Sequence, residues 1–119
     1  MDLNGRKLAI LEDEYLIRLE LERIVLECGA ASVHATSTVD ELARWLNEGH
    51  PCDLAIAELT ARGQSALPLI LRVRALGIPV ICTTAYEVDA AMIIAMQGVP
   101  VVTKPYGKAQ ILRAAASLG

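Results

Sequence analysis

The 119-residue chain is 54% hydrophobic but only 3% aromatic, and it contains no phenylalanine, so its core must be aliphatic. Its net charge of −3 provides no basic face for a nucleic acid. No apolar run approaches the roughly 18 residues that span a membrane, and the N-terminal residues lack the pattern of a signal peptide. The three cysteines are an odd number without metal-type spacing. We therefore expect one domain, residues 1–119, with reduced thiols in the cytoplasm and with neither a nucleic acid nor a membrane as partner.

Short apolar runs alternate with amphipathic segments along the whole chain. Strands are predicted at about residues 7–11, 31–36, 53–59, 80–84 and 100–103. Helices are predicted at about residues 14–28, 38–47, 65–76, 88–97 and 108–118. This alternation, with its short connections, predicts an α/β fold in which helices cover both faces of a five-stranded parallel sheet.

Three of the predicted helices have informative details. Thr38 and Glu41 fit the Ser/Thr-x-x-Glu capping box at the start of the second helix. Pro68 is tolerable only in the first turn of the third helix, which follows a loop at residues 60–65. The first helix is apolar over more than half its girth, because a second apolar row lies beside its inward face: Tyr15, Leu19 and Leu26. We interpret this helix as wedged between the sheet and its neighbours, with a dimer face as the alternative.

Polar side chains follow four of the predicted strands at the point where each strand ends. They are Glu12, Asp13 and Glu14 after the first strand, Glu58 after the third, Thr83 and Thr84 after the fourth, and Lys104 after the fifth. The carboxyl ends of parallel strands meet at one edge of a sheet, so these side chains should lie together. Carboxylate oxygens suit Mg²⁺, and a hydroxyl and an ammonium group can stabilise phosphoryl oxygens. Surface acids and lysines are usually only solvated, but their coincidence at four strand ends indicates a site.

In these residues the chain resembles the receiver domains of bacterial two-component response regulators, from about Arg6 to Leu118. The motifs occur in the family's order and at close to its spacing: Glu12 and Asp13, Glu58, Thr84 and Ala85, and Lys104, Pro105 and Tyr106. The resemblance implies the flavodoxin-like fold, with strand order 2-1-3-4-5. The loop at residues 63–66 and the motifs at 84–86 and 104–106 look most like stand-alone members of the family.

The resemblance assigns a role to each of these positions. In the family, an aspartate at the end of the third strand accepts a phosphoryl group from a histidine kinase or a phosphotransfer protein. The resemblance implies that Glu12 and Asp13 bind Mg²⁺ together with the carboxylate of Glu58. It also implies that Thr84 and Lys104 contact the phosphoryl group, and that the peptide bond before Pro105 is cis.

Position 58 departs from the family because it is a glutamate. The additional methylene moves the carboxylate outward by roughly 1–1.5 Å, and a displacement of about 1 Å can cost on the order of 10²-fold in rate. We therefore predict that Glu58 is not phosphorylated in the usual way. It would instead pair with Lys104 or Thr84 and partly imitate the phosphorylated state. A surface acid without a role is the alternative.

Two further departures lie near the site. The family's aromatic switch position is Val101, which cannot rotate as an aromatic ring does, so Tyr86 or Tyr106 would have to substitute for it. Ala61 and Arg62 replace the family's Met-Pro pair, and Arg62 either reaches the acidic residues or is solvated. The departures together favour a degenerate receiver.

The predicted fourth helix is apolar on nearly every side, from Ala90 to Met96. A helix on the outside of a sheet buries only one face, so Met92 and Met96 are predicted to lie at an adaptable protein interface. Receivers of the family usually dimerise or dock through the fourth helix, fifth strand and fifth helix, and this surface is the predicted homodimer interface. A well-buried helix is the alternative.

These features favour a non-enzymatic, degenerate receiver that acts by dimerising or by binding a histidine kinase, a phosphotransfer protein or another signalling protein. We expect Mg²⁺ to bind weakly, and not at all if Glu58 pairs with Lys104. The alternative function is a working phosphoacceptor or phosphate sink for a histidine kinase. A Mg²⁺-dependent phosphohydrolase is disfavoured, because the chain has no cap domain and no aspartate nucleophile at the strand end.

Overall fold

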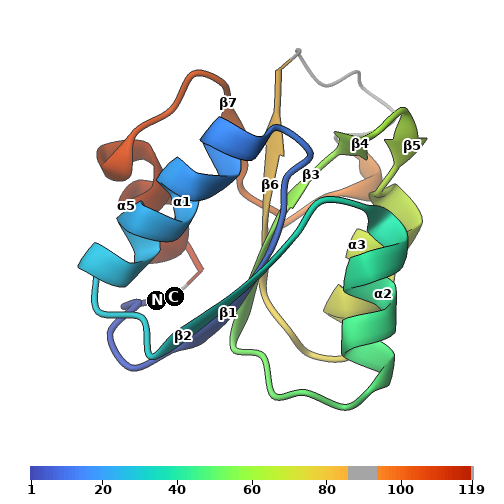
Figure 1. Cartoon of the computed structure of the whole chain (residues 1–119), viewed down its shortest axis with the longest axis horizontal. Helices are drawn as coiled ribbons and strands as arrows, with labels where there is room; N and C mark the ends of the chain where they lie inside the picture. Colours follow the sequence, from blue (N-terminus) through green and yellow to red (C-terminus); the bar gives the residue numbers. More distant parts are fainter. Residues whose placement is uncertain (86–93, 119) are drawn as a thin grey trace.

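The computed structural model describes residues 1–85 and 94–118, and its centre is a parallel β-sheet (Figure 1). The five strands of this sheet are β1 (Lys7–Leu11), β2 (Ser32–Thr36), β3 (Leu54–Glu58), β6 (Val80–Thr84) and β7 (Val101–Thr103). Their order is β2-β1-β3-β6-β7, and every neighbouring pair is parallel. Counted along the chain, this order is 2-1-3-4-5, so the predicted fold class and strand order are confirmed.

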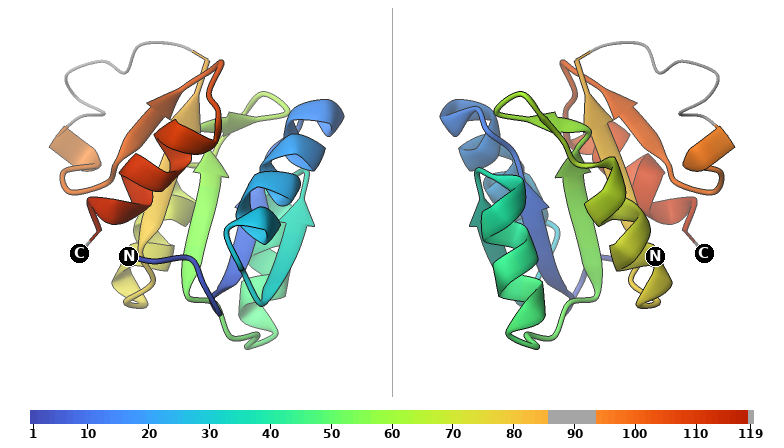
Figure 2. Two further views of the ribbon diagram at one scale, coloured as in Figure 1. Left: turned by 90° about the vertical axis from the view of Figure 1, so that its left-hand side faces the viewer. Right: turned by 90° about the vertical axis from the view of Figure 1, so that its right-hand side faces the viewer.

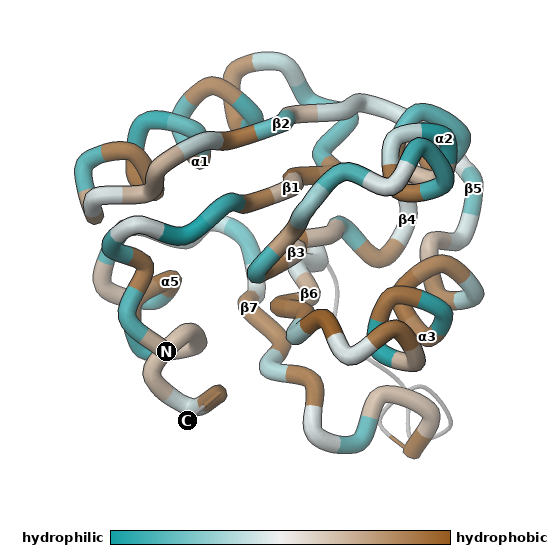
Figure 3. Tube along the Cα trace, turned by 90° about the horizontal axis from the view of Figure 1, so that it is seen from below, coloured by the Kyte–Doolittle hydropathy of each residue, from teal (hydrophilic) through white to brown (hydrophobic). Residues whose placement is uncertain are grey.

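Helices cover both faces of the sheet. α1 (Tyr15–Glu27) and α5 (Lys108–Ala116) lie on one face, and α2 (Val39–Asn47) and α3 (Leu67–Ala75) lie on the other (Figures 1 and 2). Figure 3 shows these helices with alternating hydrophobic and hydrophilic residues, as expected for elements that bury one face. None of the described helices combines the length and the apolarity that a membrane crossing requires. The helix predicted at residues 88–97 falls mostly outside the described residues.

Side-chain alternation along the strands builds a separate core on each face of the sheet. On β3, Leu54 and Ile56 belong to the core under α1 and α5, whereas Ala55 and Ala57 belong to the core under α2 and α3. The whole strand is buried, including the carboxylate-bearing Glu58 at its end. This pattern follows because successive side chains of a strand point to opposite faces, and both faces are covered.

Local sequence signals place several helix ends as predicted. Thr38 Oγ1 accepts a hydrogen bond from the backbone N–H of Glu41 at 3.1 Å, which confirms the cap of α2. Pro68 lies in the first turn of α3. Gly29, just after α1, has a φ of +91°, and a Cβ at this position would approach Asn4 Oδ1 to 2.5 Å, so glycine suits the turn.

The segment predicted as a loop at residues 60–65 forms a short hairpin instead. β4 (Thr60–Ala61) pairs antiparallel with β5 (Gln64–Ser65). The turn between them has Arg62 at φ 51° and Gly63 at φ 74°, the positive values that a two-residue type I′ turn needs. Two-residue strands leave no periodic pattern in a sequence, which explains the error. α3 accordingly begins at Leu67 rather than at residue 65.

The second apolar row of α1, formed by Tyr15, Leu19 and Leu26, is exposed. No element among the described residues covers this row, so the interpretation of α1 as a helix wedged between neighbours is wrong there. Tyr15, Leu19 and Leu26 are 62%, 43% and 52% exposed, and Leu16 beside them is 76% exposed. The physical reason is that α1 lies on the outside of the sheet and buries only its opposite face. The alternative, a dimer face, stays a prediction.

Trp45, the only tryptophan of the chain, is stacked between two histidines. The ring centroid of His34 lies 4.8 Å from that of the indole with an interplanar angle of 7°, and the values for His50 are 5.0 Å and 11°. Because His34 is on β2 and Trp45 is on α2, the stack ties the edge strand to the helix that covers it.

Ile56 on the central strand β3 is fully buried. Ile56→Ala should lower the free energy of unfolding by about 2–5 kcal/mol, because it removes buried methyl groups and leaves a cavity. Urea denaturation measures this change. Leu16→Ala on the exposed face of α1 is the matched control and should change the free energy by less than about 0.5 kcal/mol. Similar small effects in both variants would contradict the assigned core.

Candidate functional site

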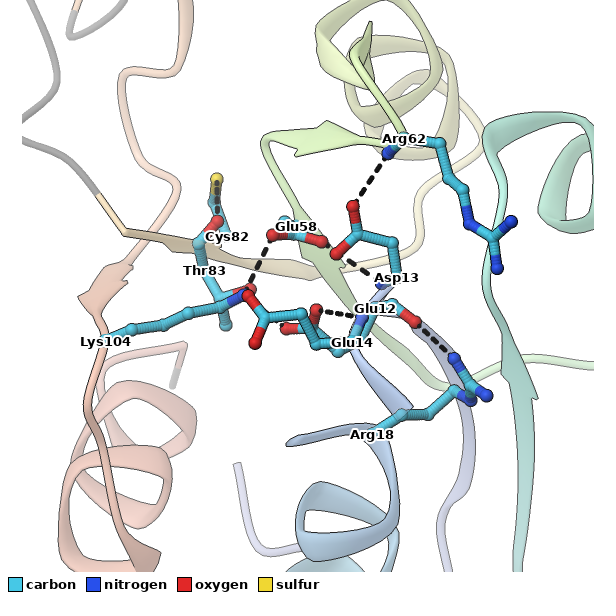
Figure 4. A network of polar contacts seen from close by, with 9 residues as sticks. All are labelled: Glu12, Asp13, Glu14, Arg18, Glu58, Arg62, Cys82, Thr83 and Lys104. Atoms are coloured by element: carbon cyan, nitrogen blue, oxygen red, sulfur yellow. Dashed lines mark hydrogen bonds and ion pairs between the residues drawn. The ribbon is translucent and has the colours of Figure 1, made fainter. Parts of the chain in front are cut away.

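The carboxyl ends of the strands bring the predicted polar residues to one edge of the sheet (Figure 4). β1 leads into Glu12 and Asp13, β3 ends at Glu58, and β7 leads into Lys104. Glu12, Asp13, Glu14 and Glu58 each offer a carboxylate oxygen within 4.8 Å of the others. The residues singled out at three strand ends therefore share one cluster, and their roles remain predictions.

Lys104 is the cation of this cluster. Its Nζ lies 2.7 Å from Glu12 Oε1, 2.8 Å from Glu58 Oε1 and 3.8 Å from Glu14 Oε1. The lysine side chain is 9% exposed, and that of Glu12 is fully buried. The predicted pairing of Glu58 with Lys104 is thus present, and the same ammonium group also neutralises Glu12.

Backbone N–H groups hold further oxygens of the same carboxylates. Asp13 N donates to Glu58 Oε2 at 3.2 Å, and Arg62 N donates to Asp13 Oδ2 at 2.8 Å. Glu14 N donates to Glu12 Oε2 at 3.0 Å. Sequence reasoning missed these contacts, because a backbone N–H is present at almost every position and has no sequence signature.

Two arginines contact the cluster in ways that the sequence does not reveal. Arg62 reaches Asp13 through its backbone, while its guanidinium group is exposed and points away from the acids (Figure 4). Arg18 of α1 donates from Nη1 to the backbone carbonyl of Glu12 at 2.8 Å. The hairpin turn and the start of α1 therefore both attach to the acidic segment after β1.

Burial and charge set the protonation of the cluster. Burial raises the pKa of Glu58 from its ordinary value of 4.5 to about 7, although the hydrogen bond from Lys104 opposes this rise. Burial also disfavours the charged form of Lys104, but the contacts with Glu12 and Glu58 outweigh it and raise the pKa of the lysine. Burial alone would raise the pKa of Asp13. Its hydrogen bonds, chiefly that from Arg62 N, outweigh burial and lower the pKa overall. Lys104 therefore stays positively charged, and several carboxylates lie close to its ammonium group.

Thr84, whose predicted contact with a phosphoryl group remains a prediction, is buried at the end of β6. It is 4% exposed, and together with Glu58, Thr60 and Ala85 it lines a cavity of about 40 Å³. The backbone N–H of Lys104 donates to the carbonyl oxygen of Thr84 at 2.8 Å, which joins β6 to the end of β7. The bond between Lys104 and Pro105 is cis, as the family resemblance implies.

The predicted switch and interface residues differ in how exposed they are. Val101 is 40% exposed on β7. The Tyr106 hydroxyl is buried without a hydrogen-bond partner among the described residues, and burial raises its pKa. Met96 is 2% exposed in the core under α2 and α3, so its side chain belongs to the core and not to an interface, which corrects the prediction. Tyr86 and Met92 lie outside the described residues.

A parallel sheet of this order is the flavodoxin-like arrangement, with the polar cluster at its carboxyl edge, and solved receiver domains share this fold. SdrG from Sphingomonas melonis Fr1 is 27% identical, with 99% of this chain and 98% of SdrG covered and a TM-score of 0.75. The receiver domain of the Arabidopsis thaliana histidine kinase CKI1, complexed with Mg²⁺ and BeF₃⁻, is 14% identical, with coverages of 98% and 91% and a TM-score of 0.79.

A CheY-like receiver domain from Methylobacillus flagellatus is 13% identical, with 96% of this chain and 98% of that chain covered and a TM-score of 0.79. At these lower identities the likeness to CKI1 and to the CheY-like domain concerns the fold alone. No family model and no curated protein matches the sequence. The chain therefore has the structure of a response-regulator receiver domain.

The raised pKa of Glu58 predicts a pH dependence of stability. Between about pH 4.5 and 7 the folded state retains a proton on Glu58 that the unfolded state releases, so the free energy of unfolding should fall as the pH rises through this window. Glu58→Gln should flatten this slope, as measured by urea denaturation at several pH values. Glu22→Gln on α1 is the control, since Glu22 has no ion pair among the described residues. Equal slopes in the wild type and Glu58→Gln would contradict the prediction.

Proposed function

We propose that the chain, residues 1–119, is a non-enzymatic receiver domain that acts in the cytoplasm by binding another protein, with a pocket that does not accept a phosphoryl group at Glu58. The observation that supports this proposal most is the ion pair between Lys104 and Glu58, because it occupies the carboxylate that would have to accept the phosphoryl group. The absence of an aspartate at the end of β3 supports it further.

Both carboxylate oxygens of Glu58 are engaged. Oε1 lies 2.8 Å from Lys104 Nζ, and Oε2 accepts a hydrogen bond from Asp13 N at 3.2 Å. A carboxylate that accepts a phosphoryl group must present an oxygen in line with the phosphorus, and small displacements from that geometry are costly. Attack by Glu58 would therefore have to occur from an oxygen that is already held by Lys104 or by Asp13 N. A carboxylate fixed against Lys104 would instead partly imitate the phosphorylated state.

The exposed face of α1 is one proposed protein-binding surface. Leu16 on this face is 76% exposed, and exposed apolar groups that lie together favour binding of a partner. A groove of about 200 Å³ adjoins it, lined by Leu16, Ile17, Glu20, Lys104, Pro105 and Tyr106. Because Lys104 lines this groove and also contacts Glu58, a partner on α1 would lie next to the pocket.

A second proposed surface lies between β7 and α5. A groove of about 510 Å³ is lined there by residues that include Val101, Gln110 and Arg113. Val101 is 40% exposed, and Leu112 of α5 is 39% exposed. We propose this surface as the homodimer interface, as predicted from the sequence. The proposed partner is a histidine kinase, a phosphotransfer protein or another signalling protein. We propose neither a nucleic acid nor a membrane as a partner.

Because Glu58 pairs with Lys104, we propose that Mg²⁺ does not bind appreciably to the carboxylate cluster of the wild type. The donor chemistry fits, because four carboxylates each bring an oxygen within 4.8 Å of the others. The CKI1 receiver, which has the same fold, was solved with Mg²⁺ and BeF₃⁻. The arrangement here does not fit the ion as it stands, because Lys104 Nζ already contacts Glu12 and Glu58.

The phosphoacceptor proposal is tested by incubating the protein with acetyl phosphate and MgCl₂ and measuring the intact mass. The wild type should gain no phosphoryl group. Glu58→Asp restores the acceptor of the family and should gain one, which makes it the matched positive control. Stoichiometric phosphorylation of the wild type at Glu58 would overturn the proposal and favour the alternative, a working phosphoacceptor or phosphate sink.

The homodimer is tested by sedimentation velocity over a range of protein concentrations. The wild type should show a concentration-dependent dimer, and Val101→Glu should shift it to monomer, because a charge would be buried in the interface. Leu16→Glu on α1 is the control and should leave the dimer intact. A dimer lost only with Leu16→Glu would move the interface to α1, and a wild type that stays monomeric would contradict dimerisation.

A further inference from the structure

We propose that Lys104 is a resident cation of the carboxylate cluster, which occupies the position of a divalent metal ion and suppresses Mg²⁺ binding. Removal of its charge would turn the cluster into a divalent-cation site. This inference rests on the proposed function and deepens it, because it explains what keeps the pocket closed to metal-dependent phosphoryl chemistry.

The contacts of Lys104 are those of a ligated cation. Its Nζ lies 2.7 Å from Glu12 Oε1 and 2.8 Å from Glu58 Oε1, with Glu14 Oε1 at 3.8 Å as a third oxygen. An ammonium group has three N–H donors and no acceptor; here it donates a hydrogen bond to Glu58 and forms a close ion pair with Glu12 and a longer one with Glu14. The side chain of Lys104 is only 9% exposed, so its ammonium group is a nearly buried counter-charge for these acids.

The carboxylates are also oriented without a metal ion. Glu58 Oε2, Asp13 Oδ2 and Glu12 Oε2 accept backbone hydrogen bonds at 3.2, 2.8 and 3.0 Å. Mg²⁺ demands a nearly ideal octahedron of oxygens at about 2.0–2.1 Å. To reach that geometry, the ion would have to displace the ammonium group, which is like-charged and already holds one oxygen each of Glu12 and Glu58.

The glutamate at position 58 makes this arrangement effective. Its side chain is one methylene longer than that of an aspartate, which lets Oε1 approach Lys104 Nζ while Oε2 remains on Asp13 N. β7, from which Lys104 follows, is separated from β3 by β6. Two long side chains therefore meet across a strand.

Loss of the lysine would leave the carboxylates in need of a counter-charge. Glu12 is fully buried and Glu58 is 7% exposed, and buried charges without a partner strongly destabilise a fold. The oxygens of Glu12, Asp13, Glu14 and Glu58 would still lie close together. A divalent cation is the counter-charge that such a set of hard oxygen ligands favours.

The experiment compares the wild type with Lys104→Met, Lys104→Arg and Lys108→Met, with Lys108 chosen as an exposed lysine on α5. Thermal unfolding is followed with and without millimolar MgCl₂ at matched ionic strength, and Mg²⁺ affinity is measured by calorimetry. Lys104→Met should bind Mg²⁺ at least about 10-fold more tightly than the wild type, because a like-charged group beside a bound ion costs several kcal/mol, and Mg²⁺ should raise its melting temperature. The wild type, Lys108→Met and the charge-conserving Lys104→Arg should not respond.

Wild-type calorimetry decides the question even if Lys104→Met fails to fold. Absence of Mg²⁺ binding up to millimolar concentration supports the resident cation, and tight binding by the wild type overturns it. Equal affinities of the wild type and a folded Lys104→Met also overturn it. A wild type that binds Mg²⁺ tightly but gains no phosphoryl group from acetyl phosphate refutes this inference alone, whereas phosphorylation at Glu58 refutes the proposed function.

Discussion

One ammonium group stands among several carboxylates at the carboxyl edge of the sheet, and the arrangement of this edge depends on it. Lys104 contacts Glu12 from β1 and Glu58 from β3, although its own strand β7 is the far edge strand. Buried acids tolerate this proximity only with a compensating charge. The lysine is long enough to cross β6, so one side chain links the end of β7 to the ends of β1 and β3, neither of which pairs with β7 directly.

The surrounding backbone makes the same cluster rigid. The segment after β1 is held by Arg18 of α1, and the hairpin of β4 and β5 brings Arg62 N to Asp13. The acids are therefore positioned by N–H groups that belong to the fold itself. A pocket built this way has its geometry before any ligand arrives.

The sequence predicts the framework of this domain well, because the framework follows from periodicity. β1 was predicted at its observed bounds, and Thr38 marked the start of α2. The pairing of Glu58 with Lys104 was also foreseen, since both follow parallel strands. The errors concern features without a periodic signal: the two-residue strands on either side of Arg62, the backbone N–H donors, and the number of faces that a helix buries. Leu19 and Met96 illustrate the last point, because apolar composition alone did not distinguish the exposed leucine from the buried methionine.

The stacking of Trp45 between His34 and His50 has a consequence for spectroscopy of this protein. The indole is the only one in the chain, so all tryptophan emission comes from the α2 side of the sheet. Its fluorescence therefore reports how α2 packs against the edge strand β2, where the indole stacks on His34.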